Sequence, residues 1–146
     1  QIDPHEEKEG CMIIQEVPLA YVNQIWPQVE TFITDALQYA HGEYTADDAR
    51  VYASSGNWSL VVASMDDGSI HGAALLSYFN RPRDRVAFVM AIGGRLITNP
   101  DTWQQFEAIM KANGATYIEG AVRDSVARLF SRYGMQEKYS IVGKSL

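Results

Sequence analysis

Residues 86–94 read VAFVMAIGG, and residues 99–120 read NPDTWQQFEAIMKANGATYIEG. The first stretch is an uninterrupted apolar run that ends on two glycines, which is typical of a strand buried on both faces. In the second stretch, Asn99-Pro100 predicts the start of a helix and Asn113-Gly114 predicts its end. The short segment that follows, residues 116–120, predicts another strand. This part of the chain therefore alternates strand, helix and strand.

The alternation continues on both sides of this stretch. Downstream, apolar residues at helical spacing predict a helix from Val122 to Tyr133, and residues 139–142 predict a closing strand. Upstream, Trp58–Ser64 and Ser69–Phe79 are predicted strands, and Asp66-Asp67-Gly68 between them is typical of a hairpin turn.

The first part of the chain adds a strand and two helices. A short strand is expected at residues 13–17, followed by an amphipathic stripe over residues 22–40 that ends at His41-Gly42. Pro27 lies inside that stripe, so it either kinks one helix or starts a second segment. Thr45 is expected to cap a short helix over residues 46–52. Together the elements predict one mixed α/β sheet with helices on both faces, in a single domain.

Composition excludes several classes of protein. The chain has 146 residues, a net charge of −6 and 47% hydrophobic residues, which suits one globular domain and argues against a general nucleic-acid binder. No apolar run is long enough to predict a membrane span, and we expect a cytoplasmic protein. Cys11 is the only cysteine, so neither a disulfide framework nor a multi-cysteine metal site is expected. Residues 1–11 are polar and are expected to be a leader, either a tag remnant or a disordered arm, with the domain spanning residues 12–146.

The predicted element order, β-α-α-β-β-β-α-β-α-β over residues 12–146, resembles the GNAT superfamily of N-acetyltransferases. The segment ARLFSRYGM at residues 127–135 is similar to the last helix of that superfamily and its exit. HGEYT at 41–45, DGSIHGA at 67–73, IGG at 92–94 and residues 123–134 resemble phage and prophage acetyltransferase-like proteins. That resemblance implies a host-cytoplasmic or virion location if the protein is phage-encoded.

The GNAT resemblance implies a cofactor and a place for it. Acetyl-CoA would lie in a cleft where two parallel strands splay apart, with its pyrophosphate on backbone N–H groups at a helix start. Ile92, Gly93, Gly94 and Arg123 are the residues expected to bind it. The substrates would be an acyl-CoA and an amine.

The cofactor loop departs from the family pattern. Aligned on the helix over residues 100–112, the family's arginine falls near Gly94 and its two glycines fall near Ile97 and Asn99. Asp101 would lie in the first helical turn, where it would repel a phosphate by about 1–3 kcal/mol. The family's proton-donating tyrosine falls on Phe130, which has no hydroxyl. The loop is thus degenerate, and this helix start is expected to be capped for stability.

Several side chains allow two interpretations. Gly93-Gly94 could form an anion-binding nest, although we favour a tight exit from the strand. Tyr133 is either a displaced general acid or a packed ring, and His41 and Glu43 either meet the acceptor amine or simply end a helical region. Arg123 is the arginine that we single out, because a guanidinium can grip phosphate with two hydrogen bonds.

Two functions stay open at this point. One is an atypical acetyl-CoA-dependent N-acetyltransferase that works mainly by holding its substrates together. The other is a non-catalytic module that kept the fold, such as a phage structural or host-interacting protein with a protein partner or a homo-oligomeric state. Fold alone cannot choose between them.

Overall fold

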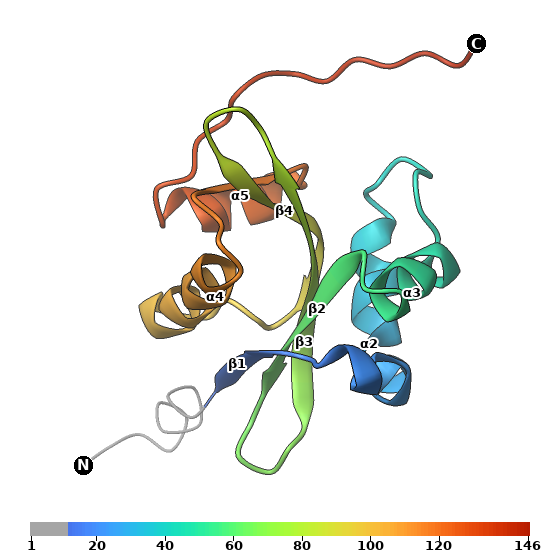
Figure 1. Cartoon of the computed structure of the whole chain (residues 1–146), viewed down its shortest axis with the longest axis vertical. Helices are drawn as coiled ribbons and strands as arrows, with labels where there is room; N and C mark the ends of the chain where they lie inside the picture. The colour runs from blue at the N-terminus through green and yellow to red at the C-terminus, as the bar shows by residue number, and fades with distance from the viewer. Residues whose placement is uncertain (1–11) are drawn as a thin grey trace.

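The computed structural model describes residues 12–146, and the predicted leader over residues 1–11 lies outside that range. One five-stranded sheet carries helices on both faces (Figure 1), as predicted. The strands are β1 (Ile13–Glu16), β2 (Trp58–Ser64), β3 (Ile70–Asn80), β4 (Arg85–Gly94) and β5 (Tyr117–Gly120). The helices are the 3-10 turn η1 (Leu19–Tyr21), α2 (Val22–Leu37), α3 (Ala46–Ser54), α4 (Pro100–Ala112) and α5 (Asp124–Ser131).

The sheet is mixed because only its last pair of strands is parallel. The strand order is β1-β2-β3-β4-β5, and the first three pairings are antiparallel. β4 and β5 are parallel and are connected through α4, the kind of helical crossover that a parallel pair requires.

Each face of the sheet has its own hydrophobic core, which explains the uninterrupted apolar runs. In β2, Val61 and Ala63 pack in one core with residues of α4 and α5. Leu60 and Val62 of the same strand pack in the other core with residues of α2 and α3. Because neighbouring side chains of a strand point to opposite faces, a strand covered on both sides is apolar at every position.

Pro27 interrupts the hydrogen bonding of α2 without ending the helix. A proline cannot donate to the carbonyl four residues earlier, so the carbonyl of Asn23 loses its usual partner. Arg50 of α3 donates to that carbonyl from Nη2 at 3.4 Å, and from Nε to Asn23 Oδ1 at 3.0 Å. The Asn23 carbonyl that Pro27 leaves without a helical donor therefore accepts a hydrogen bond from Arg50 of α3.

A β-bulge at Met90 reverses which face of the sheet the alternate side chains of β4 point to. Leu76 pairs with Val89 and Leu75 pairs with Ala91, so Met90 is the extra residue. Val89 accordingly belongs to the core beneath α4, whereas Ala91 belongs to the core beneath α2.

The predicted closing strand over residues 139–142 is wrong. This segment forms no strand, and Tyr139, Ile141 and Val142 are 67%, 79% and 90% exposed. The chain leaves the body of the molecule here (Figure 1). Lys138 lies over the ring of Tyr117, which is the first residue of β5. The chain has therefore reached the start of β5 at Lys138, and residues 139–142 have no strand of the sheet to pair with. β-propensity without a neighbouring strand does not make a strand.

Candidate functional site

A cleft opens where β4 and β5 stop pairing. Their register runs from Val86 opposite Tyr117 to Val89 opposite Gly120 and goes no further. Beyond that point β4 continues to Gly94, while the chain after β5 turns through residues 121–123 into α5. The bulge at Met90 lies at the same level, and a bulge bends its strand locally.

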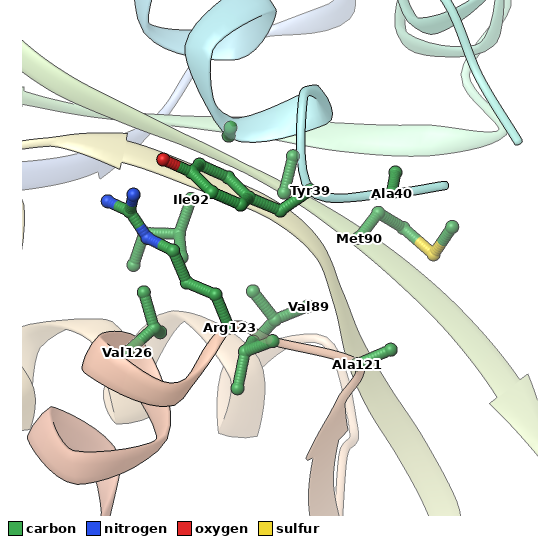
Figure 2. A pocket seen from close by; sticks show the side chains of 11 residues that line it. Tyr39, Ala40, Val89, Met90, Ile92, Ala121, Arg123 and Val126 are labelled. Carbon is green, nitrogen blue, oxygen red and sulfur yellow. The ribbon is translucent and has the colours of Figure 1, made fainter. Parts of the chain in front are cut away.

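The cleft has a narrow inner part and a wider outer part. The inner part, about 40 Å³, is lined mainly by apolar side chains of β4, α2 and α5, among them Val89, Met90 and Val126. The outer part, about 290 Å³, is lined by Asp35, Gln38 and the end of β4. Figure 2 shows the inner part between the end of α2 and the start of α5.

Arg123 and Tyr39 meet across the cleft and line both parts. The guanidinium carbon of Arg123 lies 4.4 Å from the centre of the Tyr39 ring, in the geometry of a cation–π contact. Figure 2 shows the two side chains reaching toward each other from opposite walls. Tyr39 is half exposed, so the pair is open to the outside.

The structure brings the four predicted site residues together. Ile92, Gly93, Gly94 and Arg123 all line the outer part of the cleft. The first three end β4, and Arg123 is the N-cap residue of α5. Their role as cofactor ligands remains a prediction.

The two glycines have a packing explanation. A Cβ on Gly93 would lie 2.2 Å from the carbonyl oxygen of Phe32, in the backbone of α2. Gly94 has φ +69° and would place a Cβ 2.5 Å from the carbonyl oxygen of His71. Only glycine fits such close backbone contacts, which supports the tight exit from the strand that we favoured.

The start of α4 satisfies its own hydrogen bonds, as the sequence predicted. The side chain of Asn99 accepts from the Thr102 N–H at 2.8 Å, and Thr102 Oγ1 accepts from the Asn99 N–H at 3.2 Å and the Thr98 N–H at 2.9 Å. Asp101 accepts from Gln105. Leu96 and Ile97, in the loop before this helix, are buried in the core. A loop tied down in this way leaves few donors for a pyrophosphate.

The aromatic residues of α5 and the turn after it belong to the core. Phe130 is 1% exposed and its ring lies 5.5 Å from that of Trp103. Tyr133 stacks on the same indole at 4.8 Å, with 9° between the planes. The packed-ring interpretation of Tyr133 therefore holds, and neither residue lines the cleft.

At the end of α2, the residues that line the cleft differ from the two that the sequence singled out. His41 and Glu43 are exposed and do not line the cleft, whereas Asp35 and Tyr39 do. Neither Asp35 nor Tyr39 belongs to the apolar stripe of α2, and nothing else in the sequence sets them apart. Their position becomes visible only when β5 and α5 are placed opposite them.

Within residues 12–146 no group of three or more histidine, cysteine, aspartate or glutamate side chains could hold a metal ion. The same residues contain no helix that is long and apolar enough to cross a bilayer.

Known structures share the fold of this chain over nearly its whole length. An aminoglycoside acetyltransferase from an uncultured soil metagenomic sample, in complex with sisomicin, superposes with a TM-score of 0.66 at 9% identity, covering 94% of this chain and 98% of the other. A tetramutant of the BH1408 protein from Bacillus halodurans gives a TM-score of 0.64 at 16% identity, covering 92% of this chain and 99% of the other. A ribosomal-protein-alanine N-acetyltransferase from Brucella melitensis gives 0.64 at 11% identity, with the same coverage.

The chain has the GNAT fold. No protein-family model matches its sequence, and no curated protein does. The cleft between β4 and β5 is the place where the GNAT resemblance put the cofactor. At these identities the likeness concerns the fold, and function has to be argued from the residues of the cleft.

Proposed function

We propose that the cleft between β4 and β5 binds an acyl-CoA and that the protein is an atypical N-acyltransferase. The observation that carries this proposal is the placement of Arg123 on a cleft formed by the splay of two parallel strands. The small apolar inner part suits a short acyl group, and the wider outer part, with its arginine, suits phosphates.

The phosphate anchor in this proposal is the start of α5. Its N-cap residue, Arg123, makes no side-chain cap. The Val126 N–H donates to the Arg123 carbonyl, and no side chain caps the N–H groups of the two residues before it. A guanidinium beside such a helix start is a favourable arrangement for an anion. Asp124 lies in the same first turn and offsets part of that attraction. We therefore expect binding in the micromolar range.

Catalysis would depend on proximity. The amine attacks the thioester carbonyl, the C–S bond breaks, and the amine proton ends on the thiolate or on water. Holding the two reactants in one cleft can contribute several kcal/mol. Of the described residues that line the cleft, Asp35, Tyr39 and Arg123 are the ionisable ones. Asp35 and the Tyr39 hydroxyl are the groups that could relay the proton.

A second candidate function is a non-catalytic binding module, of the kind expected for a phage structural or host-interacting protein. The self-capped start of α4 and the burial of Leu96 and Ile97 favour this alternative. Such a protein would keep the fold and bind no CoA.

Calorimetric titration with acetyl-CoA, and separately with CoA, distinguishes the two functions. Micromolar binding that Arg123→Ala weakens about 10- to 100-fold supports the first, since a hydrogen bond to a charged group contributes about 1.5–3 kcal/mol. Arg128→Ala is the matched control, because Arg128 is an exposed arginine of the same helix that does not line the cleft. Absence of heat and of a thermal shift at millimolar ligand supports the binding module. Equal affinity of Arg123→Ala and the unmodified protein would refute the anchor.

A further inference from the structure

Arg123 is held differently from the arginines that stabilise the fold. Arg50, Arg81 and Arg85 each donate hydrogen bonds to oxygen atoms of a distant segment of the chain. Within residues 12–146, the side chain of Arg123 has no such oxygen as a partner, and its contact is the ring of Tyr39. The guanidinium is therefore kept in place by an aromatic ring and not by a hydrogen-bond acceptor.

A contact with a ring leaves a guanidinium able to bind a ligand. The face of the ring attracts the positive charge, whereas a phosphate or a carboxylate is gripped by the N–H groups of the guanidinium. An arginine bound to a carboxylate, as Arg81 is bound to Glu119, has already used two of these donors. Arg123 keeps its donors at a position that lines both the inner and the outer part of the cleft.

The backbone fixes the position of the ring more closely than that of the arginine. Tyr39 lies in the turn that follows α2, where its N–H donates to the Ala36 carbonyl at 3.3 Å and the Ala40 N–H donates to the Leu37 carbonyl at 3.0 Å. Arg123 is an exposed residue with a long side chain, and such a side chain loses much rotamer freedom when it binds a ligand. Figure 2 shows its guanidinium reaching toward the Tyr39 ring across the cleft. The ring therefore restricts Arg123 before any ligand arrives.

We propose that Tyr39 is a positioning residue for Arg123, and that its ring holds the guanidinium across the cleft with the N–H groups ready for an anion. Ordering the arginine in the free protein lowers the cost of ordering it on binding. The inference deepens the proposed function and rests on it in one respect, namely that the anion is a phosphate group of an acyl-CoA. The position of Arg123 on the ring is a property of the free protein and does not depend on that function.

NMR of the free protein tests whether the ring holds Arg123. An aromatic ring shifts the resonances of protons that lie over its face upfield. We expect the side-chain protons of Arg123 to resonate upfield of those of Arg128, an exposed arginine of the same helix. Tyr39→Phe should keep this shift because it keeps the ring, and Tyr39→Leu should abolish it.

Calorimetric titration with CoA, and separately with inorganic pyrophosphate, tests the effect on binding. Tyr39→Leu should weaken the affinity about two- to fivefold, as expected for the loss of a cation–π contact at an exposed site, and Tyr39→Phe should keep it. In an Arg123→Ala background, Tyr39→Leu should change nothing further, because the ring acts through the arginine. Tyr21→Leu is the matched control, since Tyr21 is 54% exposed against 51% for Tyr39 and does not line the cleft.

The outcomes separate the positioning role from the proposed function. The positioning role is overturned if Tyr39→Leu leaves the Arg123 resonances or the affinity unchanged, and CoA binding by the unmodified protein would then still support the proposed function. It is also overturned if Tyr39→Leu weakens binding equally with and without Arg123, because the ring would then contact the ligand itself or support the fold. If the unmodified protein binds neither ligand, the proposed function fails, and the Arg123 resonances alone decide whether Tyr39 positions the arginine.

Discussion

Gly93→Ala tests the packing explanation of the glycine pair. The new methyl group would lie 2.2 Å from the carbonyl oxygen of Phe32 and 2.9 Å from its carbonyl carbon. A carbon approaches a carbonyl oxygen no closer than about 3.3 Å, so α2 and β4 would have to separate by about 1 Å. Overpacking of a core costs about 1–3 kcal/mol and sometimes more. Because the obstacle here is helix backbone, we expect a loss of about 3 kcal/mol.

Two other glycines provide the controls. Gly143→Ala meets nothing within 4 Å, so it should change stability by less than about 0.5 kcal/mol. Gly42→Ala also meets nothing within 4 Å, but Gly42 has φ +77°, so it isolates backbone strain and should cost about 1 kcal/mol. The three changes separate steric contact from backbone conformation at the same added volume.

Urea unfolding followed by circular dichroism measures all three variants. The expected order of midpoints is Gly143→Ala highest, then Gly42→Ala, then Gly93→Ala, with unchanged slopes. If Gly93→Ala and Gly143→Ala had the same midpoint, the contact between β4 and α2 would be looser than described. The glycine pair would then need another explanation, and an anion nest would be the first to consider.

Four further changes test other parts of the structure. Asn99→Ala should destabilise the protein by about 1 kcal/mol in thermal melts through loss of the cap, with CoA affinity unchanged; weaker CoA binding would place phosphate at α4 after all. Phe130→Ala should cost about 3–5 kcal/mol in urea unfolding, and a loss below 1 kcal/mol would contradict its place in the core. Asp124→Asn should tighten CoA binding severalfold in calorimetry by removing a repelling charge, and no change would argue against phosphate at α5. Hydrogen bonds from Arg81 lower the pKa of Glu119 from 4.5 to about 2, so its ion pair stabilises the fold fully above about pH 4.5 and loses that effect as the pH falls toward 2. Glu119→Gln should therefore flatten the acid side of the stability curve, and an unchanged slope between these pH values would be inconsistent with this ion pair.

Helices, strands and turns were predictable where the signal comes from residues that are neighbours in the sequence. The apolar run of β4, the Asn99-Pro100 helix start and the Asp66-Asp67-Gly68 turn each depend on neighbouring residues only, and each is present. The predicted strand over residues 139–142 failed because a strand needs a partner strand. Composition alone does not supply one.

The sequence indicated only one wall of the cleft, the one formed by the end of β4 and the start of α5. Ile92, Gly93, Gly94 and Arg123 follow from the resemblance and lie together at the cleft. Tyr39 is an ordinary residue near the end of a helix until the fold places it 4.4 Å from Arg123. Likewise, Arg81 makes two hydrogen bonds to Glu119, which lies 38 residues further along the chain. Contacts between segments far apart in the sequence leave no local pattern to read.

The amide of Gln105 has a consequence for aggregation. A sheet open at both ends can accept one chain after another, which is the geometry of a fibril. Here Gln105 of α4 occupies the Ile14 N–H and the Met12 carbonyl at the outer edge of β1, so two of the backbone groups that a further strand would need are already bonded. A side chain from a neighbouring helix can thus protect the edge of a sheet against the addition of a further chain.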